Sequence, residues 1–345
     1  MKRIAVLSSG TDNAGINSAI RAIVRTGITG GAQVFGIESG FRGLVEDRIF
    51  KLSSRDVSGK IGKPGCFLGS SKPTYLDNPT KITKALANLN KKSIEGLIVI
   101  GGGGTFATAM KLTGDLPINN SNSIGAIQNG IRVIGIPSTV QDDIVGTDIC
   151  LGVDTAVNNI MNCVDHIRSC DSSRNRSFLV EVEGRDSGSL AMRAAIVCGA
   201  EVVLTPEIST KSDKDFEELV NQIESFSNSG KTQCICLVSR GWKPGIKTLT
   251  QFLTEKMGES DVGIRETILG HIQRGGSPSA NDRLLGTSFG SNATKALLEG
   301  HTGEFVALQK NHVALVPISE TIGKVKAVNQ QSEALFKVTN TSTCD

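Results

Sequence analysis

The apolar stretch Gly96-Leu97-Ile98-Val99-Ile100 predicts a buried strand. It runs directly into a glycine-rich turn, Gly101-Gly102-Gly103-Gly104. A helical pattern follows at Thr105–Leu112. The same order recurs along the chain, and it predicts further strands at 4–7, 33–37, 132–136, 178–182, 202–204 and 234–238. Because these apolar runs are continuous rather than alternating, both faces of their sheet should be covered by helices. The sequence therefore predicts an α/β protein of two doubly wound lobes with mainly parallel sheets.

Composition narrows the class of protein. The chain has 345 residues, enough for two packed domains, and a net charge of +3 with no long basic tract. No apolar run approaches the ~20 residues of a membrane-spanning helix, and the first apolar stretch is too short for a signal peptide. We therefore expect a cytoplasmic protein without a nucleic-acid or membrane partner. Of eight cysteines, Cys234 and Cys236 lie in an apolar run without a CxxC motif, so they are expected to be buried strand thiols.

Two glycine-rich turns follow predicted strands, one at Ser9–Gly15 and one at Gly101–Thr105. Such a turn exposes backbone N–H groups at the positive end of a helix, where phosphate binds, and glycine lets the ligand approach closely. Neither turn is a Walker loop or a GxGxxG motif. Taken singly, each could equally be a structural tight turn. Two of them in one sheet favour a nucleotide or sugar phosphate site.

Two further segments carry charged side chains. Asp142 and Asp143, in the stretch 137–143 after a predicted strand, suit magnesium binding or acid–base chemistry, although they could equally mark the start of a helix. His271 and Arg274 lie in Leu-Gly-His-Ile-Gln-Arg-Gly-Gly-Ser-Pro at 269–278, with Arg265 shortly before. These cations could clamp a phosphate, because the guanidinium fork bonds two oxygens at once.

The string at 269–278 resembles the phosphofructokinase family and little else. Segments 43–48, 67–70 and 180–185 match further family motifs in the same order, and the resemblance runs from about Arg3 to Ile322. It implies an ATP:fructose-6-phosphate 1-phosphotransferase architecture of glycolysis, with ATP and Mg²⁺ as cofactors. The implied assembly is a homotetramer, or a hetero-oligomer with an active paralogue. The implied lobes are 1–152 plus 273–322 on the nucleotide side and 153–272 plus 323–345 on the sugar-phosphate side. Residues 117–130 look like an inserted surface loop.

Site residues are carried over from the family position by position. The sugar phosphate, fructose 6-phosphate or a similar one, would be bound by Arg176, Glu183, Gly184, Arg185, Arg240, Arg265, His271 and Arg274, with Arg176 and Arg265 acting in the neighbouring subunit's site. Nucleotide positions are Gly10, Thr11, Phe41, Lys72, Gly103, Gly104 and Thr105. Catalytic positions are Thr139, Gln141, Asp143 and Arg185. A nucleotide or phosphoenolpyruvate effector would be bound by Arg21, Arg25, Arg55, Arg168, Glu201 and Lys231.

The departures from the family gather around the transferred phosphate. The family's magnesium-binding aspartate is Gly103 here, its catalytic base is Gln141, and its other changed positions are Thr11, Lys72, Arg240 and Glu183. The resemblance therefore implies a protein that binds sugar phosphate and effectors but is catalytically impaired, as a regulatory or non-catalytic subunit. The alternative is an active ATP-dependent enzyme that uses Asp142 or Asp143 as its base. The pyrophosphate-dependent branch matches less well, since it differs at Ser138 and Gly104, and a pure scaffold would not need the retained arginines.

Overall fold

The structure is a computed structural model that describes residues 1–114, 130–170, 176–208, 213–228, 233–256 and 263–340. Lys231 and all but the last residue of the predicted loop 117–130 lie outside these ranges. The chain divides into two compact units. Unit 1 comprises Met1–Thr139, Ile144–Thr155 and Arg274–Lys324, and unit 2 comprises Val140–Asp143, Ala156–Gln273 and Val325–Asp345.

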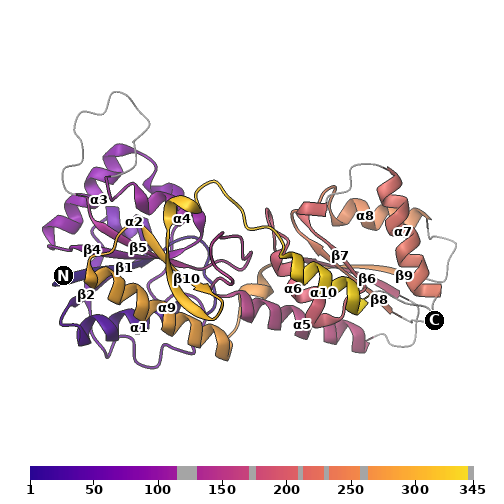
Figure 1. Ribbon diagram of the computed structural model, residues 1–345, viewed down its shortest axis with the longest axis horizontal. Helices are drawn as coiled ribbons and strands as arrows, with labels where there is room; N and C mark the ends of the chain where they lie inside the picture. Colours follow the sequence, from indigo (N-terminus) through magenta and orange to yellow (C-terminus); the bar gives the residue numbers. More distant parts are fainter. Residues whose placement is uncertain (115–129, 171–175, 209–212, 229–232, 257–262, 341–345) are drawn as a thin grey trace. The chain divides into compact units, whose positions relative to one another are not determined.

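Unit 1 is built on a seven-stranded sheet with the order β11-β10-β5-β4-β1-β2-β3 (Figure 1). Its inner strands are parallel, and only the edge strands β3 and β11 pair antiparallel to their neighbours. The strands are β1 (Arg3–Ser8), β2 (Gln33–Ile37), β3 (Ile49–Leu52), β4 (Gly96–Gly101), β5 (Arg132–Pro137), β10 (Glu304–Gln309) and β11 (His312–Pro317).

Helices cover both faces of this sheet, as the continuous apolar strands predict. Helices α1 (Ile16–Thr29) and α9 (Ala280–Glu299) pack on one face, and α2 (Gly40–Val45) and α4 (Gly103–Met110) pack on the other, with α3 (Pro79–Lys91) against α2. Glycine makes the close contact of α1 with α9 possible, because a Cβ at Gly290 would lie 2.3 Å from the Ala19 carbonyl oxygen.

Unit 2 contains a four-stranded parallel sheet with the order β7-β8-β6-β9. Its strands are β6 (Arg176–Val182), β7 (Val202–Leu204), β8 (Gln233–Ser239) and β9 (Gly263–Ile268), and its helices are α5 (Val153–Cys170), α6 (Ser189–Cys198), α7 (Asp213–Asn228), α8 (Ile246–Lys256) and α10 (Gln330–Asn340). Cys234 and Cys236 are buried on β8 in the core shared with α7 and α8, which confirms them as strand thiols. Helix α6 also packs on the sheet, and α10 packs against α6.

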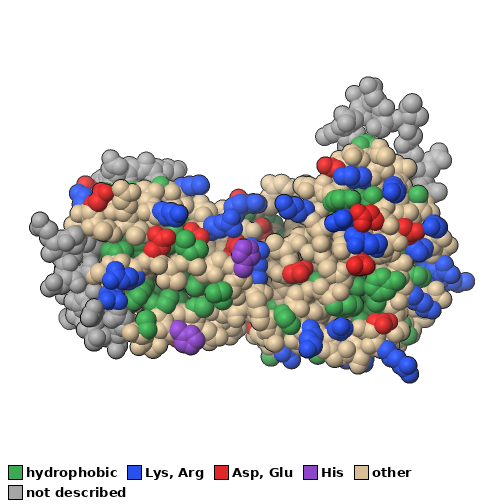
Figure 2. Space-filling model, turned by 180° about the vertical axis from the view of Figure 1, so that it is seen from behind, with side chains coloured by type: hydrophobic (Ala, Val, Ile, Leu, Met, Phe, Trp, Pro, Cys, Tyr) green, Lys and Arg blue, Asp and Glu red, His purple; other side chains and the backbone are tan. Residues whose placement is uncertain are grey.

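The predicted fold class is confirmed: both units are α/β, with mainly parallel sheets. The carboxyl ends of parallel strands share one edge, so the turns that follow β1 and β4 are brought together in unit 1. No helix in the described ranges is long and apolar enough to cross a membrane. Lys and Arg side chains are interspersed with Asp and Glu on the face seen in Figure 2, in line with the small net charge.

Candidate active site

The two glycine-rich turns of unit 1 are hydrogen-bonded neighbours. Ser8 on β1 is in register with Ile100 on β4, and the next amide, that of Ser9, donates to the Ile100 carbonyl at 2.9 Å. The hydroxyl of Thr105 donates to the Ser9 carbonyl at 3.2 Å, and Thr105 is only 1% exposed. Thr105, predicted as a nucleotide ligand, therefore uses its side chain to tie one turn to the other.

Three other nucleotide positions surround the first turn. Gly10 has φ 95°, a left-handed conformation that favours glycine, and its amide donates to the Ser71 carbonyl at 2.9 Å. Thr11 and Lys72 are exposed and available to a ligand. Phe41 is fully buried in α2, so its ring belongs to the core of unit 1 rather than to a ligand-facing surface.

Gly103, the family position of the magnesium ligand, is the first residue of α4. A Cβ added there would meet no atom within 4 Å, so crowding does not require glycine at this position. Without a side chain it cannot supply a carboxylate. Nor does the described part of the chain group three or more His, Cys, Asp or Glu side chains around a possible metal position. The residues present therefore do not fit the Mg²⁺ site that the family resemblance implies.

The segment 140–143, which holds the family's base position, is a turn. The helix start considered for Asp142 and Asp143 is wrong, because the next helix, α5, begins only at Val153. The side-chain oxygen of Gln141 accepts a hydrogen bond from the Arg185 amide at 2.9 Å. Gln141 thus serves as a support for the turn at 183–185.

Asp142 is not suited to act as the substitute base. Its side chain is 0% exposed, and its carboxylate lies 2.8 Å from the Lys326 ammonium and 3.3 Å from the Arg193 guanidinium. It also accepts a hydrogen bond from the Ser189 hydroxyl at 2.9 Å. A general base must reach the proton that it abstracts, and a carboxylate enclosed in this way cannot. Of the two carboxylates proposed for the alternative mechanism, only Asp143 is partly exposed.

The turn at 183–185, predicted to bind the sugar, is held from two sides. Gly184 has φ 133°, and its carbonyl accepts bonds from the Ser239 hydroxyl at 2.7 Å and the Gly241 amide at 2.8 Å. Gln273 is 1% exposed, accepts from the Glu183 amide at 3.0 Å and donates to the Gly270 carbonyl at 2.9 Å. Gln273 thereby joins the turn to the short helix that carries His271. This role of Gln273 is not predicted from the sequence, although the residue lies within the string at 269–278.

Glu183 and Arg240, the two departures from the family at the predicted sugar site, form a pair. Glu183 is buried, and its carboxylate lies 3.7 Å from the guanidinium of Arg240, which is exposed. Arg185 forms an ion pair with Asp186 at 2.8 Å, and this hydrogen-bonded carboxylate raises the pKa of Arg185. Both members of that second pair are well exposed, so it adds little stability and leaves Arg185 able to bind an incoming anion.

Within one chain, the predicted phosphate ligands are divided between the two ends of the unit 2 sheet. Arg176 begins β6 and Arg265 is near the start of β9, and both side chains border Gly263. Gly184 and His271 follow the opposite, carboxyl ends of these strands. Arg176 and Gly184 are thus separated by the length of β6, roughly 20 Å at about 3.3 Å per residue.

The predicted effector residues are divided between the two units. In unit 1, Arg21 and Arg25 lie four apart on α1, with Arg25 exposed, and Arg55 follows β3. In unit 2, Arg168 donates to the carbonyls of Cys198 and Gly199 at 3.1 and 2.9 Å and lies 3.9 Å from Glu201. Glu201 is buried and accepts from the Ile235 amide at 2.8 Å. Arg168 therefore supports the end of α6, and Glu201 contacts β8.

Replacing Gly184 with Ala should disrupt the sugar-binding turn. The new Cβ would lie 2.4 Å from the Ser239 hydroxyl oxygen and 2.6 Å from the Ser187 carbonyl oxygen, at a φ that alanine avoids. We expect sugar phosphate affinity to fall more than tenfold, measured by calorimetry. Gly245→Ala is the matched control, because Gly245 has φ 105° but open space around it, so only a backbone cost of about 1–3 kcal/mol is expected. Equal loss of affinity in the two variants would contradict the steric explanation.

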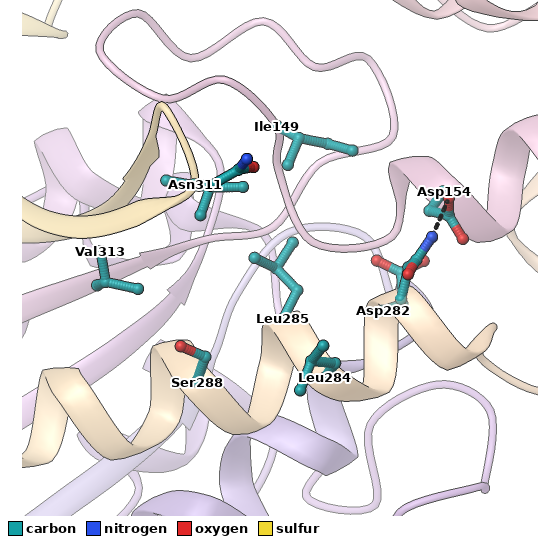
Figure 3. A pocket seen from close by; sticks show the side chains of 10 residues that line it. Ile149, Asp154, Asp282, Leu284, Leu285, Ser288, Asn311 and Val313 are labelled. Atoms are coloured by element: carbon teal, nitrogen blue, oxygen red, sulfur yellow. Dashed lines mark hydrogen bonds between the residues drawn. The ribbon is translucent and has the colours of Figure 1, made fainter.

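A cavity of about 540 Å³ lies elsewhere in unit 1, beside the first turns of α9 and the β10–β11 hairpin (Figure 3). Its lining is mainly apolar, with Asp154 and Asp282 at one end. Burial raises the pKa of Asp282, which accepts from the Gly152 and Thr155 amides at 2.8 Å and so holds the start of α5. None of the predicted site residues lines this cavity, so it is separate from the candidate active site.

Comparison with known proteins agrees with the motifs. Residues 3–297 match the family model described as Phosphofructokinase. The chain is 39% identical to the ATP-dependent 6-phosphofructokinase of Lactococcus lactis subsp. lactis over 340 residues, which cover 99% of this chain and 94% of that protein. It is 41% identical to the enzyme of the same name from Aquifex aeolicus over 308 residues, 89% of this chain and 90% of that one.

Among solved structures, Pichia pastoris phosphofructokinase in the T-state superposes with a TM-score of 0.84 at 28% identity. The match covers 98% of this chain but only 39% of that longer chain. From the family model and the identity to these relatives, the chain belongs to the phosphofructokinase family.

Proposed function

We propose that this chain binds fructose 6-phosphate, or a similar sugar phosphate, together with anionic effectors, but transfers phosphate poorly. It would act in glycolysis, in the cytoplasm, as a regulatory or non-catalytic subunit. The observation that carries the proposal is the state of the turn 140–143. Position 141 holds a neutral amide bonded to the Arg185 amide, and the carboxylate of Asp142 is buried among cations.

Sugar phosphate binding is assigned to unit 2 and to Arg274, which begins the last part of unit 1. Gly184, Arg185, His271 and Arg274 would supply one half of the site. Because Arg176 and Arg265 lie at the other end of the unit 2 sheet, they would serve the site of another copy. The site would therefore be complete only in an assembly, either a homotetramer or a hetero-oligomer with an active paralogue.

Phosphoryl transfer would be impaired for two reasons. A general base contributes about 10²–10⁴ to the rate, and the Gln141 amide cannot accept the proton of a sugar hydroxyl. Position 103 supplies no carboxylate for the metal that neutralises charge on the transferred phosphate. The turns of unit 1 after β1 and β4 still suit the phosphates of a nucleotide, because they present glycine backbone at the start of α4.

The second candidate function is an active ATP-dependent 6-phosphofructokinase, which the names of the relatives at about 40% identity favour. In that case Asp143 becomes the candidate base, since Asp142 is enclosed. Thr139, which directly precedes this turn, would bind substrate in either case.

Two measurements on the purified full chain test the proposal. Calorimetry should detect fructose 6-phosphate binding, and a coupled assay with ATP, Mg²⁺ and fructose 6-phosphate should give a turnover far below the ordinary range of about 1–10³ per second. Absence of sugar phosphate binding by the assembled chain would refute the binding function. Turnover within the ordinary range would refute impairment and support the second candidate.

An anionic effector should stabilise the folded chain. Arg21 and Arg25 share one face of α1, and a ligand at 100 times its Kd adds about 2.7 kcal/mol to the free energy of unfolding. We expect ADP or phosphoenolpyruvate to raise Tm in a thermal melt, and Arg21→Ala with Arg25→Ala to abolish the rise. Arg3→Ala serves as a control outside the proposed effector set. If neither compound raises Tm of the wild type, the effector assignment is wrong.

A further inference from the structure

We propose that Lys326 and Arg193 are positioning residues for the sugar-phosphate site. By neutralising the buried carboxylate of Asp142, they fix the turn 140–143, and Gln141 of that turn holds the sugar-binding turn at 183–185. The inference rests on the proposed sugar phosphate binding for its functional consequence, but the positioning itself can be measured without any sugar.

The carboxylate of Asp142 is a buried charge. Its side chain has no exposed surface, and a buried carboxylate is costly unless it is paired and hydrogen-bonded. The Lys326 ammonium at 2.8 Å, the Arg193 guanidinium at 3.3 Å and the Ser189 hydroxyl at 2.9 Å provide that pairing. Removing the Lys326 cation therefore leaves the buried carboxylate under-compensated, which favours displacement of the turn.

The backbone of the turn 140–143 has an unusual conformation at Asp142. Asp142 has φ 52°, a left-handed conformation that a non-glycine residue keeps only when its surroundings hold it there. Lys326 holds it at two points, because its backbone amide also donates to the Asp143 carbonyl at 2.9 Å. The same residue thus fixes both the side chain of Asp142 and the backbone that follows it.

Gln141 connects the turn 140–143 to the proposed sugar site. Gln141 directly precedes Asp142, and its side-chain oxygen accepts the Arg185 amide at 2.9 Å. Arg185 directly follows Gly184, whose backbone lies at φ 133°. Contacts therefore run without a gap from Lys326 through Asp142 and Gln141 to the turn that would close over the sugar.

The positioning groups come from distant parts of the sequence that meet in unit 2. Ser189 and Arg193 lie on α6, against which α10 packs. Lys326 lies in the segment that leads into α10 and is only partly exposed, with 18% of its side chain accessible. The segment from Lys326 to the end of α10 is thus fastened to unit 2 both by α10 on α6 and by Lys326 on Asp142.

Lys326→Met tests the inference, because methionine keeps an apolar stem and removes the charge. Hydrogen exchange of the full chain, followed by mass spectrometry, should become at least ~10-fold faster in peptides that report residues 141–143 and Arg185. Affinity for fructose 6-phosphate, by calorimetry, should fall by about tenfold or more. Lys326→Arg should restore both values to near wild type, because it restores the cation. Lys324→Met, at an exposed lysine two residues earlier, should change neither.

The outcomes separate the two claims. Unchanged exchange at 141–143 and Arg185 in Lys326→Met overturns the positioning role, whether or not sugar binds. Faster exchange in a chain whose wild type binds no sugar phosphate supports the positioning of the turn and refutes the proposed function. Should Lys326→Met fail to fold, Asp142→Asn with Lys326→Met removes the uncompensated charge. That variant should fold and still show faster exchange at Arg185, and wild-type exchange in it would overturn the inference.

Discussion

Gly103→Asp combined with Gln141→Asp and Thr11→Gly is expected to raise turnover of fructose 6-phosphate at least ~100-fold over the wild-type chain, as one restored general base alone can contribute 10²–10⁴. The structure favours the first change, because a Cβ at Gly103 meets no atom within 4 Å. An acidic residue at the first position of α4 is also favourable to the helix dipole. The aspartate at 141 would supply the proton acceptor that the amide lacks.

The single changes should do little. Base and metal ligand act on the same transition state, so the gains of the singles should not predict the gain of the combination. Gln141→Asp alone should change turnover less than tenfold, roughly 1.4 kcal/mol in activation free energy. Gly104→Asp in place of Gly103→Asp is the matched control, since it adds the same carboxylate one residue along α4. Activity restored equally by both would argue against a specific ligand position.

A wild-type turnover in the ordinary enzyme range would contradict this prediction. In that event Asp143→Asn should abolish activity if Asp143 is the base. Asp142→Asn should then reduce activity only through the conformation of the turn, because the Asp142 carboxylate has no exposed surface.

Arg265→Ala is expected to weaken fructose 6-phosphate binding by about 10- to 150-fold, because a charge-assisted bond to phosphate is worth roughly 1.5–3 kcal/mol. His271→Ala should have a similar effect, and Arg132→Ala, at an exposed arginine on β5, should have none. Calorimetry on the assembled chain measures all three. Wild-type affinity in Arg265→Ala would remove it from the site.

Mixing the Arg265→Ala chain with the His271→Ala chain tests whether each site takes residues from two copies. Arg265 lies in the first half of β9 and His271 beyond the end of that strand, and under the proposed function each site should take one from each of two copies. After dissociation and random reassembly, about one quarter of the sites in a symmetric oligomer should be intact, because they combine the unaltered halves of the two variants. Calorimetry should then detect a tight class of sites absent from either variant alone. No tight sites in the mixture would mean that both residues serve the same chain.

Local sequence patterns predicted the strands and the turns after them well, because each is determined by adjacent residues. The run Gly96–Ile100 with its glycines is β4 followed at once by α4. The turn at 140–143 was harder: its two acids fit a helix start equally well, and only the cations around Asp142 select the turn. Phe41 fits a nucleotide contact by motif, yet its ring is enclosed in the core, which no local pattern indicates.

Contacts between residues that are distant in the sequence could not be predicted from it. Glu183 and Arg240 are read singly as two departures from the family, but in space they are one ion pair at 3.7 Å. Lys326 carries no motif at all, and its role follows only from the path of the chain back to Asp142. Such contacts depend on which strands become neighbours, and a single sequence does not specify that order.

The path of the chain through the two units also sets an order in which they can form during synthesis. All four strands of the unit 2 sheet lie between Arg176 and Ile268, so they all emerge from the ribosome before β10 does. The unit 1 sheet must wait, because β10 can pair beside β5 only after residue 309 has emerged, and β11 completes the sheet after residue 317. Until β10 has emerged, the edge of β5 has no partner strand on that side, and an unpaired strand edge of this kind is prone to associate with other chains.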